Sequence, residues 1–444
     1  MPFKNLLSRT GRNRHPSAIQ FNCKEELCAK WDAEPEDFVE LNHGDPNERW
    51  FPWTKFTMEL NDGTSVSLDK DELATVLQYL PTVGYQPLLD SLSSLMLRFH
   101  KGEGILNKEG EWGVIACCGA MDGVSKSFDM FLDEGDTYLL EIPCYANILA
   151  SLHPYGGHPI CCDVDQDGLD PVQIRKKIEE AKAKGLPTPK FLYTCPTATN
   201  PAGLTTSAER RREIYKMACE YDFFIIEDDP YFFVRFDEEL FKNIPSYLAL
   251  DTEGRVIRID SFSKSLSSGI RLGWITASKE VIDKMILHTE STVMHASGVS
   301  QAIVAKLFEH WGIDKFLEHT KKVANFYRKQ METMCAVVDK NLGDIVEYQK
   351  PNGGLFLWMK IPKIKDTQFL VQIRAASKLV MFVHGTAFQP DFADPDQIAN
   401  GGFRQYIRAA YSQVTPKEMD TVRIFSCFFL NLFSLSFTGF PSLT

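Results

Sequence analysis

Between Trp112 and Ala277, short apolar runs alternate with amphipathic stretches, and no other feature of the sequence constrains the fold as strongly. The runs VIACC (114–118) and FFIIE (223–227) are apolar almost throughout, instead of at every second residue. This pattern is typical of parallel strands whose two faces are both covered by helices. We therefore predict an α/β fold with a large domain, whose mostly parallel sheet has helices on both faces, and a smaller α/β domain.

The apolar runs also give the expected elements of the large domain. Strands are expected at residues 113–118, 138–142, 159–164, 191–195, 223–227, 255–262 and 272–277. A charged helix is expected at 170–184, and a capping box at 206–209 is expected to open another helix.

The rest of the chain has a different pattern. Residues 279–340 contain no proline and are predicted to form long helices. Shorter strands are expected at 354–360 and 378–383, and a helix is expected to begin at Pro416. The predicted domain bounds are 1–49 for an N-terminal arm with part of the small domain, 50–315 for the large domain, 316–423 for the small domain and 424–444 for an atypical apolar tail.

Composition narrows the classes of partner and compartment. The formal net charge of −11 argues against a nucleic-acid partner, because proteins that bind nucleic acid usually carry a basic surface. The eleven cysteines include no CxxC pair and no cysteine–histidine metal spacing. This usage predicts a reduced intracellular protein without a metal site.

The two ends of the chain leave alternatives open. The first 24 residues contain basic side chains and no acid, which fits either a short organelle-targeting peptide or a basic arm of the mature protein. We therefore expect a cytoplasmic or mitochondrial location. Residues 424–444 are uncharged and rich in phenylalanine, and could be a membrane anchor, a segment buried on the small domain, or a terminus replaced by altered splicing or read-through. Membrane contact is expected only if this tail is native.

Five of the expected strands of the large domain, those at 113–118, 138–142, 191–195, 223–227 and 255–262, lead into loops with candidate ligand residues, at the edge where ligands of open α/β sheets bind. The set comprises Ala120 and Met121 at a helix start, then Tyr145, Asn200, Asp228, Tyr231, Ser261, Ser263, Lys264 and Arg271. A pyridine aldehyde phosphate needs a lysine for a Schiff base, an acid at its ring nitrogen and donors for its phosphate. Each residue alone has an ordinary structural explanation, since a single lysine after a strand is usually a surface lysine.

Several segments resemble one family. SFSKSLSSGIRLGW (261–274) resembles the lysine motif of class I, fold-type I aminotransferases, which use pyridoxal phosphate (PLP). IIEDDPYF, TNPAG and IPCYANIL resemble the other cofactor segments of that family. HPSAI, LQYLPTVGY, PKFLYT, RVIRIDSFSK and YIRAAYS resemble its kynurenine/2-aminoadipate and aromatic amino acid aminotransferase subgroup. The resemblance extends from about Arg14 to about Arg423.

The resemblance implies a role for each matching residue. Lys264 would form the Schiff base and carry the proton, and Asp228 would pair with the pyridinium nitrogen. Around the rest of the cofactor, Asn200 and Tyr231 would form hydrogen bonds with the ring hydroxyl oxygen, Tyr145 would stack on the ring, and the phosphate would be held by Ser261, Ser263 and Arg271. Arg408 would bind the substrate α-carboxylate, and Tyr79 would reach the partner subunit's cofactor in a homodimer. Two positions depart from the family pattern. Ala120 and Met121 replace small polar phosphate ligands, and Gln20 replaces an arginine of members that use 2-aminoadipate.

The predicted activity is transfer of an amino group to a 2-oxo acid such as 2-oxoglutarate. The expected donors are tyrosine, phenylalanine, tryptophan and kynurenine, with 2-aminoadipate as a further candidate. Three alternatives stay open: a PLP-dependent lyase on the same fold, a non-catalytic cofactor-binding regulator, and an inactive splice form suggested by the tail. The sequence before the motifs is too short for the DNA-binding helix-turn-helix of such regulators.

Overall fold

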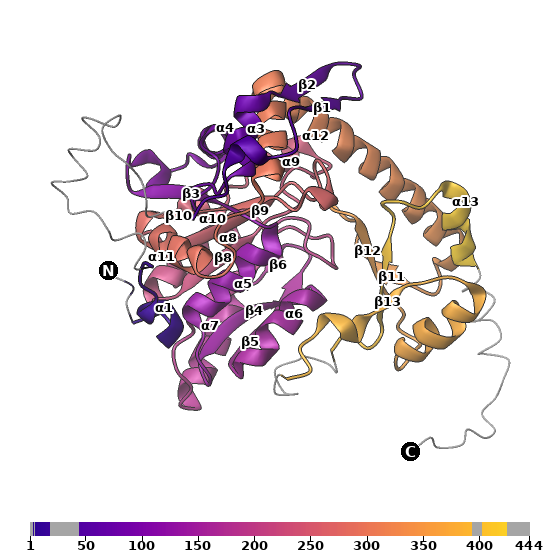
Figure 1. The fold of residues 1–444 in the computed structure, drawn as a ribbon. Coiled ribbons are helices and arrows are strands. Elements are labelled where there is room, and N and C mark those ends of the chain that lie inside the picture. The colour runs from indigo at the N-terminus through magenta and orange to yellow at the C-terminus, as the bar shows by residue number, and fades with distance from the viewer. Residues whose placement is uncertain (1–2, 4, 18–43, 393–401, 424–444) are drawn as a thin grey trace. The chain divides into compact units, whose positions relative to one another are not determined.

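The computed structural model describes residues 3, 5–17, 44–392 and 402–423 (Figure 1). Gln20 and the apolar tail therefore lie outside the described residues. The chain forms two compact units, each built from separate segments. Unit 1 comprises Met1–Asp133, Phe223–Pro230 and Pro245–Glu318, and unit 2 comprises Glu134–Asp222, Tyr231–Ile244 and His319–Thr444. The large mixed sheet has eight strands, four from each unit.

The four sheet strands of unit 1 are almost completely buried. Their order is β3 (Trp112–Cys117), β10 (Gly273–Ser278), β9 (Val256–Ser261) and β8 (Phe224–Asp228). β8 and β9 are parallel, whereas β10 is antiparallel to both of its neighbours. All four strands were expected from the apolar runs, and their bounds differ from the expected ones by one residue.

Helices of unit 1 pack against these strands. α5 (Ala120–Phe131) contacts β9 and β10, and α11 (Lys279–Glu290) contacts β3 and β10. The expected long helices are confirmed as α11 and α12 (Gly298–Leu342), which breaks at Gly312 where φ is 64°. The remaining elements are α1 (Arg9–Asn13), the hairpin β1 (Phe56–Glu59) and β2 (Ser65–Leu68), α3 (Lys70–Leu77), α4 (Gln86–His100) and α10 (Tyr247–Leu250).

Unit 2 supplies the other four strands of the large sheet. Their order is β7 (Phe191–Thr194), β4 (Thr137–Ile142), β5 (His158–Asp165) and β6 (Gly168–Leu169). β4 is parallel to both β5 and β7, and β6 is antiparallel to β5. The accompanying helices are α6 (Ala146–Leu152), α7 (Pro171–Ala183), α8 (Ala208–Tyr221) and α9 (Glu238–Phe241).

The capping box predicted at 206–209 is wrong in register. The N-cap of α8 is Ser207, whose hydroxyl accepts a hydrogen bond from the backbone N–H of Arg210. Thr206 is buried, and its backbone N–H donates to the carbonyl oxygen of Pro196. The preceding loop therefore holds Thr206, and the helix begins one residue later than expected.

A second, antiparallel sheet lies within unit 2. Its order is β11 (Glu347–Tyr348), β12 (Phe356–Lys360), β14 (Tyr406–Ala410) and β13 (Val383–His384). One face carries Leu357, Met359 and Ile407, which join a buried cluster with Val338 and Leu342 of α12. Phe356, Trp358, Lys360, Tyr406 and Arg408 share the opposite face, because side chains alternate along a strand.

The strand expected at 378–383 is wrong, apart from Val383. Residues 370–378 instead form the π-helical segment η7 (Leu370–Ala375) and the short 3₁₀ turn η8 (Ala376–Lys378). Leu370, Val371 and Ala375 are buried together, so a helical spacing of apolar residues prevails here. The helix expected from Pro416 is confirmed as α13 (Pro416–Met419), which a capping box of Thr415 and Glu418 opens.

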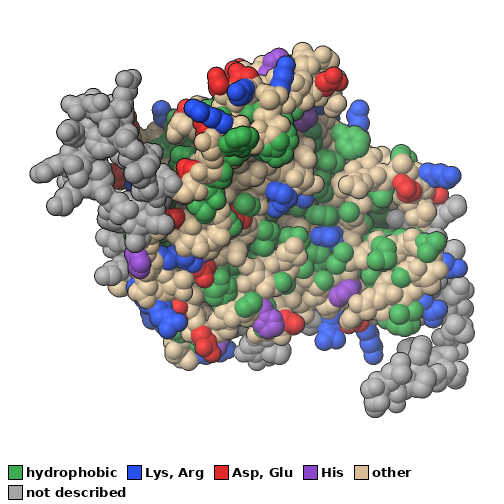
Figure 2. All heavy atoms as spheres, viewed as in Figure 1, with side chains coloured by type: hydrophobic (Ala, Val, Ile, Leu, Met, Phe, Trp, Pro, Cys, Tyr) green, Lys and Arg blue, Asp and Glu red, His purple; other side chains and the backbone are tan. Residues whose placement is uncertain are grey.

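Two surface properties bear on partners. Acidic and basic side chains are interspersed over the face seen in Figure 2. Within the described ranges, no helix is both long enough and apolar enough to cross a membrane.

Candidate active site

The predicted site residues fall into two groups, one in each unit. Unit 1 contains Tyr79, Ala120, Met121, Asp228, Ser261, Ser263, Lys264 and Arg271, and unit 2 contains Tyr145, Asn200, Tyr231 and Arg408. Each group is described separately below.

Lys264 lies in the tight turn between β9 and β10. The turn closes on Phe262, whose carbonyl oxygen accepts hydrogen bonds from the N–H groups of Leu266 (2.9 Å) and Ser267 (3.2 Å). The Phe262 ring is buried and packs against Trp274, with ring centroids 4.7 Å apart. A packed aromatic anchor therefore fixes the backbone that presents the half-buried Lys264 side chain.

Three polar side chains converge beside the lysine turn. The Ser261 and Ser263 hydroxyl oxygens are 3.0 Å apart, and Arg271 Nη1 donates to the Ser263 hydroxyl at 3.3 Å. Arg271 adopts a left-handed backbone conformation, and its Nη2 donates to the carbonyl oxygen of Cys118 at 3.2 Å. Arg271 forms no ion pair with any residue that the structure describes. The group thus offers two hydroxyls and an uncompensated guanidinium to an anion.

The N-terminus of α5 belongs to the same group. Its N-cap is Gly119, at φ 85°, and no side chain caps the first turn. A Cβ atom at Gly119 would clash with the Arg271 guanidinium, so glycine permits this close approach. The backbone N–H groups at Ala120 and Met121 therefore face the same region as Arg271, and a helix N-terminus favours an anion. As the sequence indicated, these two side chains add no donors of their own.

Asp228 is the last residue of β8 and is buried. Its neighbours Glu227 and Asp229 both contact the buried Arg258, at 3.2 Å and 3.0 Å. Because side chains alternate along a strand, Asp228 is directed to the opposite face from these two acids. Asp260 also binds Arg258, at 2.7 Å. Burial raises the pKa of Asp260 to about 7, and Arg258 opposes that rise.

In unit 2, the Arg408 guanidinium occupies an apolar setting. Its Nη1 donates to Asn200 Oδ1 at 2.8 Å, and the group lies over the rings of Phe356 (4.0 Å) and Phe388 (4.9 Å). Arg408 Nε is buried without a hydrogen-bond partner, and Arg408 has no ion pair within the described ranges. Since an uncompensated buried cation is costly, this arrangement favours binding of an anion such as a carboxylate.

Two tyrosines surround the same guanidinium. Burial lowers the pKa of Arg408, whereas Tyr231 and Tyr145 raise it. Tyr231 is buried, with its ring edge-on to Phe356 at 6.5 Å, and Tyr145 is half-buried at the start of α6. The structure thus brings Asn200, Tyr145, Tyr231 and Arg408 together within unit 2. Phe388 was not among the predicted site residues, because no motif in the sequence includes it.

Tyr79 differs from the other predicted residues. It follows α3, its side chain is 54% exposed, and its ring is edge-on to His295 at 6.2 Å. Tyr79 therefore belongs to unit 1, but its ring contacts His295 and none of the other predicted site residues that the structure describes.

Glu141 is a buried acid near the group around Arg408, and the sequence did not indicate it. It lies on β4 and accepts hydrogen bonds from the hydroxyls of Thr194 and Thr199, the latter at 3.1 Å. Thr199 precedes Asn200, so Glu141 holds the loop that positions the Arg408 partner. Burial raises the pKa of Glu141 to about 7, and the threonine hydrogen bonds oppose the rise.

This shift predicts a pH dependence of stability. Because the folded-state pKa of Glu141 is raised, its contribution is fully present below about pH 4.5 and is lost as the pH rises through about 7. In the wild type, the free energy of unfolding should therefore decrease between about pH 5 and about pH 8. We expect this decrease to be roughly 1–3 kcal/mol smaller in Glu141→Gln, as measured by urea unfolding at several pH values in this range. Glu213→Gln, which changes an exposed acid of α8, is the control. Identical pH slopes for wild type and Glu141→Gln would contradict the assignment.

Comparison with known proteins identifies the family. The family model for aminotransferase class I and II matches residues 39–422. The chain belongs to this family. It is 35% identical over 427 residues to the mitochondrial kynurenine/alpha-aminoadipate aminotransferase of Bos taurus, covering 95% of this chain and 97% of the relative.

Solved structures agree with this assignment. The aromatic aminotransferase Aro9 of Candida albicans has a TM-score of 0.82 and 28% identity, covering 97% of this chain and 98% of that one. The kynurenine aminotransferase of Pyrococcus horikoshii, solved with PMP, has a TM-score of 0.72 and 25% identity, covering 96% and 98%. The chain is thus a PLP-dependent aminotransferase that acts on amino acids and 2-oxo acids, and the predicted fold class, enzyme class and cofactor are confirmed.

The residues of this aminotransferase fit PLP. Ser261, Ser263, Arg271 and the uncapped start of α5 suit its phosphate, and the buried Asp228 suits its pyridinium nitrogen. Arg408, with its buried Nε lacking a partner, suits a substrate carboxylate.

The phosphate group yields a second prediction. We expect Ala120→Ser to tighten PLP binding about three- to tenfold, because the new hydroxyl adds one hydrogen-bond donor at the first turn of α5. Titration of the apoenzyme with PLP, followed by fluorescence, measures the Kd. Ala208→Ser makes the same change at the first turn of α8 and should leave the Kd unchanged. An unaltered Kd for Ala120→Ser would show that the side chain at 120 does not reach the phosphate.

Proposed function

We propose that this aminotransferase moves the amino group of an aromatic or related α-amino acid to a 2-oxo acid such as 2-oxoglutarate. The observation that carries the proposal is Arg408, a cation without an ion-pair partner in the described ranges, held by Asn200 against Phe356 and Phe388. Such a site pairs a carboxylate while offering aromatic surface to the rest of the molecule. The relatives named for kynurenine and aromatic substrates support the same donors.

Each predicted residue has a proposed task in this reaction. Ser261, Ser263, Arg271 and the N–H groups at Ala120 and Met121 hold the phosphate, and Asp228 keeps the ring nitrogen protonated. Tyr145 covers the ring face, while Asn200 and Tyr231 bind the ring hydroxyl oxygen. When bound, PLP supplies an electron-withdrawing ring that stabilises the charge left on the substrate Cα when its proton is removed.

Lys264 and Arg408 act on the substrate itself. Lys264 would hold PLP covalently through its side-chain amine, and that amine, once free, would be the base that accepts the proton from the substrate Cα. Arg408 binds the α-carboxylate through two parallel N–H donors, and its bond to Asn200 fixes the orientation of the guanidinium. This orientation places the Cα–H bond in a constant position relative to the bound carboxylate.

The test is a donor panel. The purified protein is supplied with PLP, 2-oxoglutarate and one amino acid at a time, and glutamate is measured. Glutamate formed in equal amount to the donor's oxo acid supports transamination. Release of ammonia or another small product without an acceptor would favour the lyase alternative instead.

Gln20 bears on the choice of donor, although it lies outside the described residues. We expect a higher kcat/KM for tyrosine, phenylalanine, tryptophan or kynurenine than for 2-aminoadipate, because a neutral glutamine cannot compensate a second carboxylate. Gln20→Arg should narrow the difference about tenfold or more, measured by initial rates on both donor types. Gln20→Lys tests whether charge alone suffices. Equal efficiency on both donor types, unchanged by either variant, would remove Gln20 from the substrate site.

We further propose a homodimer in which Tyr79 reaches the partner subunit's cofactor. Tyr79 is 54% exposed, and Trp50 and Trp53 of the same unit are 86% and 53% exposed. Tyr and Trp are enriched at protein–protein interfaces, so these exposed aromatic side chains support the proposal. We also propose the domain bounds predicted from the sequence. A cytoplasmic or mitochondrial location is a further proposal, which the mitochondrial location in the name of the bovine relative supports.

A further inference from the structure

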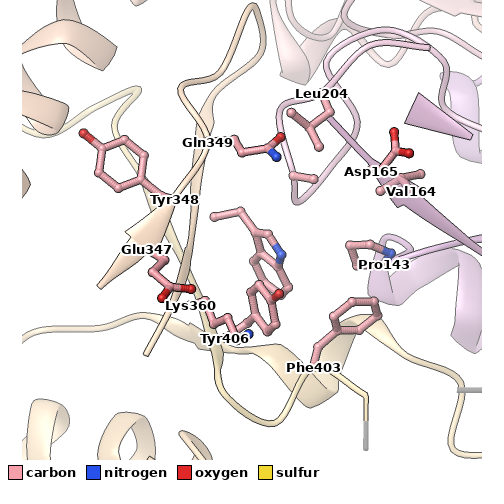
Figure 3. A pocket seen from close by; sticks show the side chains of 12 residues that line it. Pro143, Val164, Asp165, Leu204, Glu347, Tyr348, Gln349, Lys360, Phe403 and Tyr406 are labelled. Carbon is pink, nitrogen blue, oxygen red and sulfur yellow. The ribbon is translucent and has the colours of Figure 1, made fainter. Parts of the chain in front are cut away.

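A cavity of about 310 Å³ lies within unit 2 (Figure 3). Three aromatic residues form much of its wall. The rings of Trp358 and Tyr406 are stacked, with centroids 5.1 Å apart and 16° between their planes, and Phe403 lies edge-on to Trp358 at 5.9 Å. Pro143 and Leu204 line another part of the wall. The volume is at the small end of the range for ligand pockets, and suits a molecule the size of one amino acid.

The cavity also carries one available cation and one available carboxylate. Lys360 and Glu347 are direct partners in the pairing of β11 with β12, and Figure 3 shows both near Tyr406. Neither side chain forms an ion pair or a hydrogen bond with another residue in the part of the chain described. Asp165 also lines the cavity, but two bonds of 2.6 and 2.9 Å to Arg210 neutralise it.

The cavity is separate from the carboxylate site at Arg408. None of Arg408, Asn200, Tyr145 and Tyr231 lines it. Phe388 lies between the two sites, because its ring contacts the Arg408 guanidinium at 4.9 Å and the Trp358 ring at 5.2 Å.

The two sites nevertheless share structural supports. Pro143 and Leu204 belong to the loops that carry Tyr145 and Asn200. Trp358 and Arg408 are direct partners in the pairing of β12 with β14. A ligand that moves the Trp358 ring would therefore press on Phe388, and through it on Arg408.

We propose that this cavity is a second site that binds an aromatic amino acid as a zwitterion and modulates the carboxylate site. The ligand ring packs against Trp358 and Phe403, its carboxylate pairs with Lys360, and its ammonium group pairs with Glu347. As direct antiparallel partners, Glu347 and Lys360 have Cα atoms about 5 Å apart, and both residues line the cavity, so one zwitterion can contact both side chains. The existence of this second site is argued from the lining of the cavity alone, whereas its effect on the carboxylate site rests on the proposed function.

Equilibrium dialysis with radiolabelled α-methyl-L-phenylalanine, which keeps the ring and the zwitterion but has no Cα proton for the enzyme to remove, tests the proposal on the full-length PLP enzyme. We expect two sites for each chain in the wild type. Arg408→Leu should remove the reaction site and retain the second one. In that background, Lys360→Glu should weaken the remaining site about tenfold or more, Leu204→Trp should fill the cavity and abolish binding, and Lys360→Arg should retain it.

A control variant tests whether any charge reversal on the surface weakens binding. Lys365→Glu makes the same charge reversal at an exposed position outside the cavity and should leave binding unchanged. One site in the wild type, or a second site that Lys360→Glu and Leu204→Trp do not affect, would overturn the proposal. Failure of the donor panel with binding retained in Arg408→Leu would instead count against the proposed reaction alone.

Discussion

Lys264→Ala should lower the rate of transamination by at least about 10⁴-fold, because the change removes both the covalent link to the cofactor and the base at the substrate Cα. Lys264→Arg should be equally inactive, since it keeps a positive charge but lacks a nucleophilic amine. The rate is measured as 2-oxoglutarate-dependent formation of glutamate. Borohydride reduction followed by mass spectrometry gives an independent measurement, and should attach the cofactor mass to the Lys264 peptide of the wild type only.

Folding must remain intact for this result to be informative. Lys264 lies in an already packed turn, in which the ring of Phe262 supplies the apolar contacts, so we expect little change in Tm. Lys108→Ala changes an exposed lysine of the same unit and should retain full activity. Turnover above about one per cent of wild type in Lys264→Ala would refute the assignment of this lysine.

Arg408→Gln should reduce kcat/KM by about 10²- to 10³-fold for every donor, because a desolvated substrate carboxylate loses its charged, two-pronged partner. Arg408→Lys should recover only part of the loss, since an ammonium group cannot reproduce the paired geometry. Arg404→Gln is a matched control two residues before β14, where the side chain forms only a 3.7 Å surface ion pair with Asp366. A change of less than about threefold for Arg408→Gln would place the carboxylate elsewhere.

The large sheet was predictable because its strands are buried on both faces. Runs such as VIACC and FFIIE have no polar alternation to confuse the assignment, and β3 and β8 begin and end within one residue of the expected bounds. The segment at 378–383 failed for the opposite reason. Leu379 and Met381 of this segment are exposed, and Val380 and Phe382 are only partly buried. Val371 and Ala375 just before it are buried at a spacing of four residues, and the local pattern alone does not show which apolar residues enter the core.

The site residues were predictable where they lie close together in the sequence. Ser261, Ser263, Lys264 and Arg271 are close in the chain, so their contacts follow from one turn. The partnership of Arg408 with Asn200 joins residues 208 positions apart; the strand-end pattern indicated Asn200, but only the resemblance to a family indicated Arg408. Phe388, Glu141 and Arg258 were missed, because their importance comes from burial beside distant residues.

The buried Arg258 has a consequence for how the site assembles. It is one cation shared by Glu227 of strand β8, by Asp229 directly after that strand and by Asp260 of strand β9, and these two strands end in Asp228 and Ser261. A slip of one residue between the two strands would turn the acids of β8 away from Arg258 and leave buried charges uncompensated, at a cost of several kcal/mol. Charge matching therefore favours the observed register, which holds Asp228 at the end of β8 next to the strand that leads into the lysine turn.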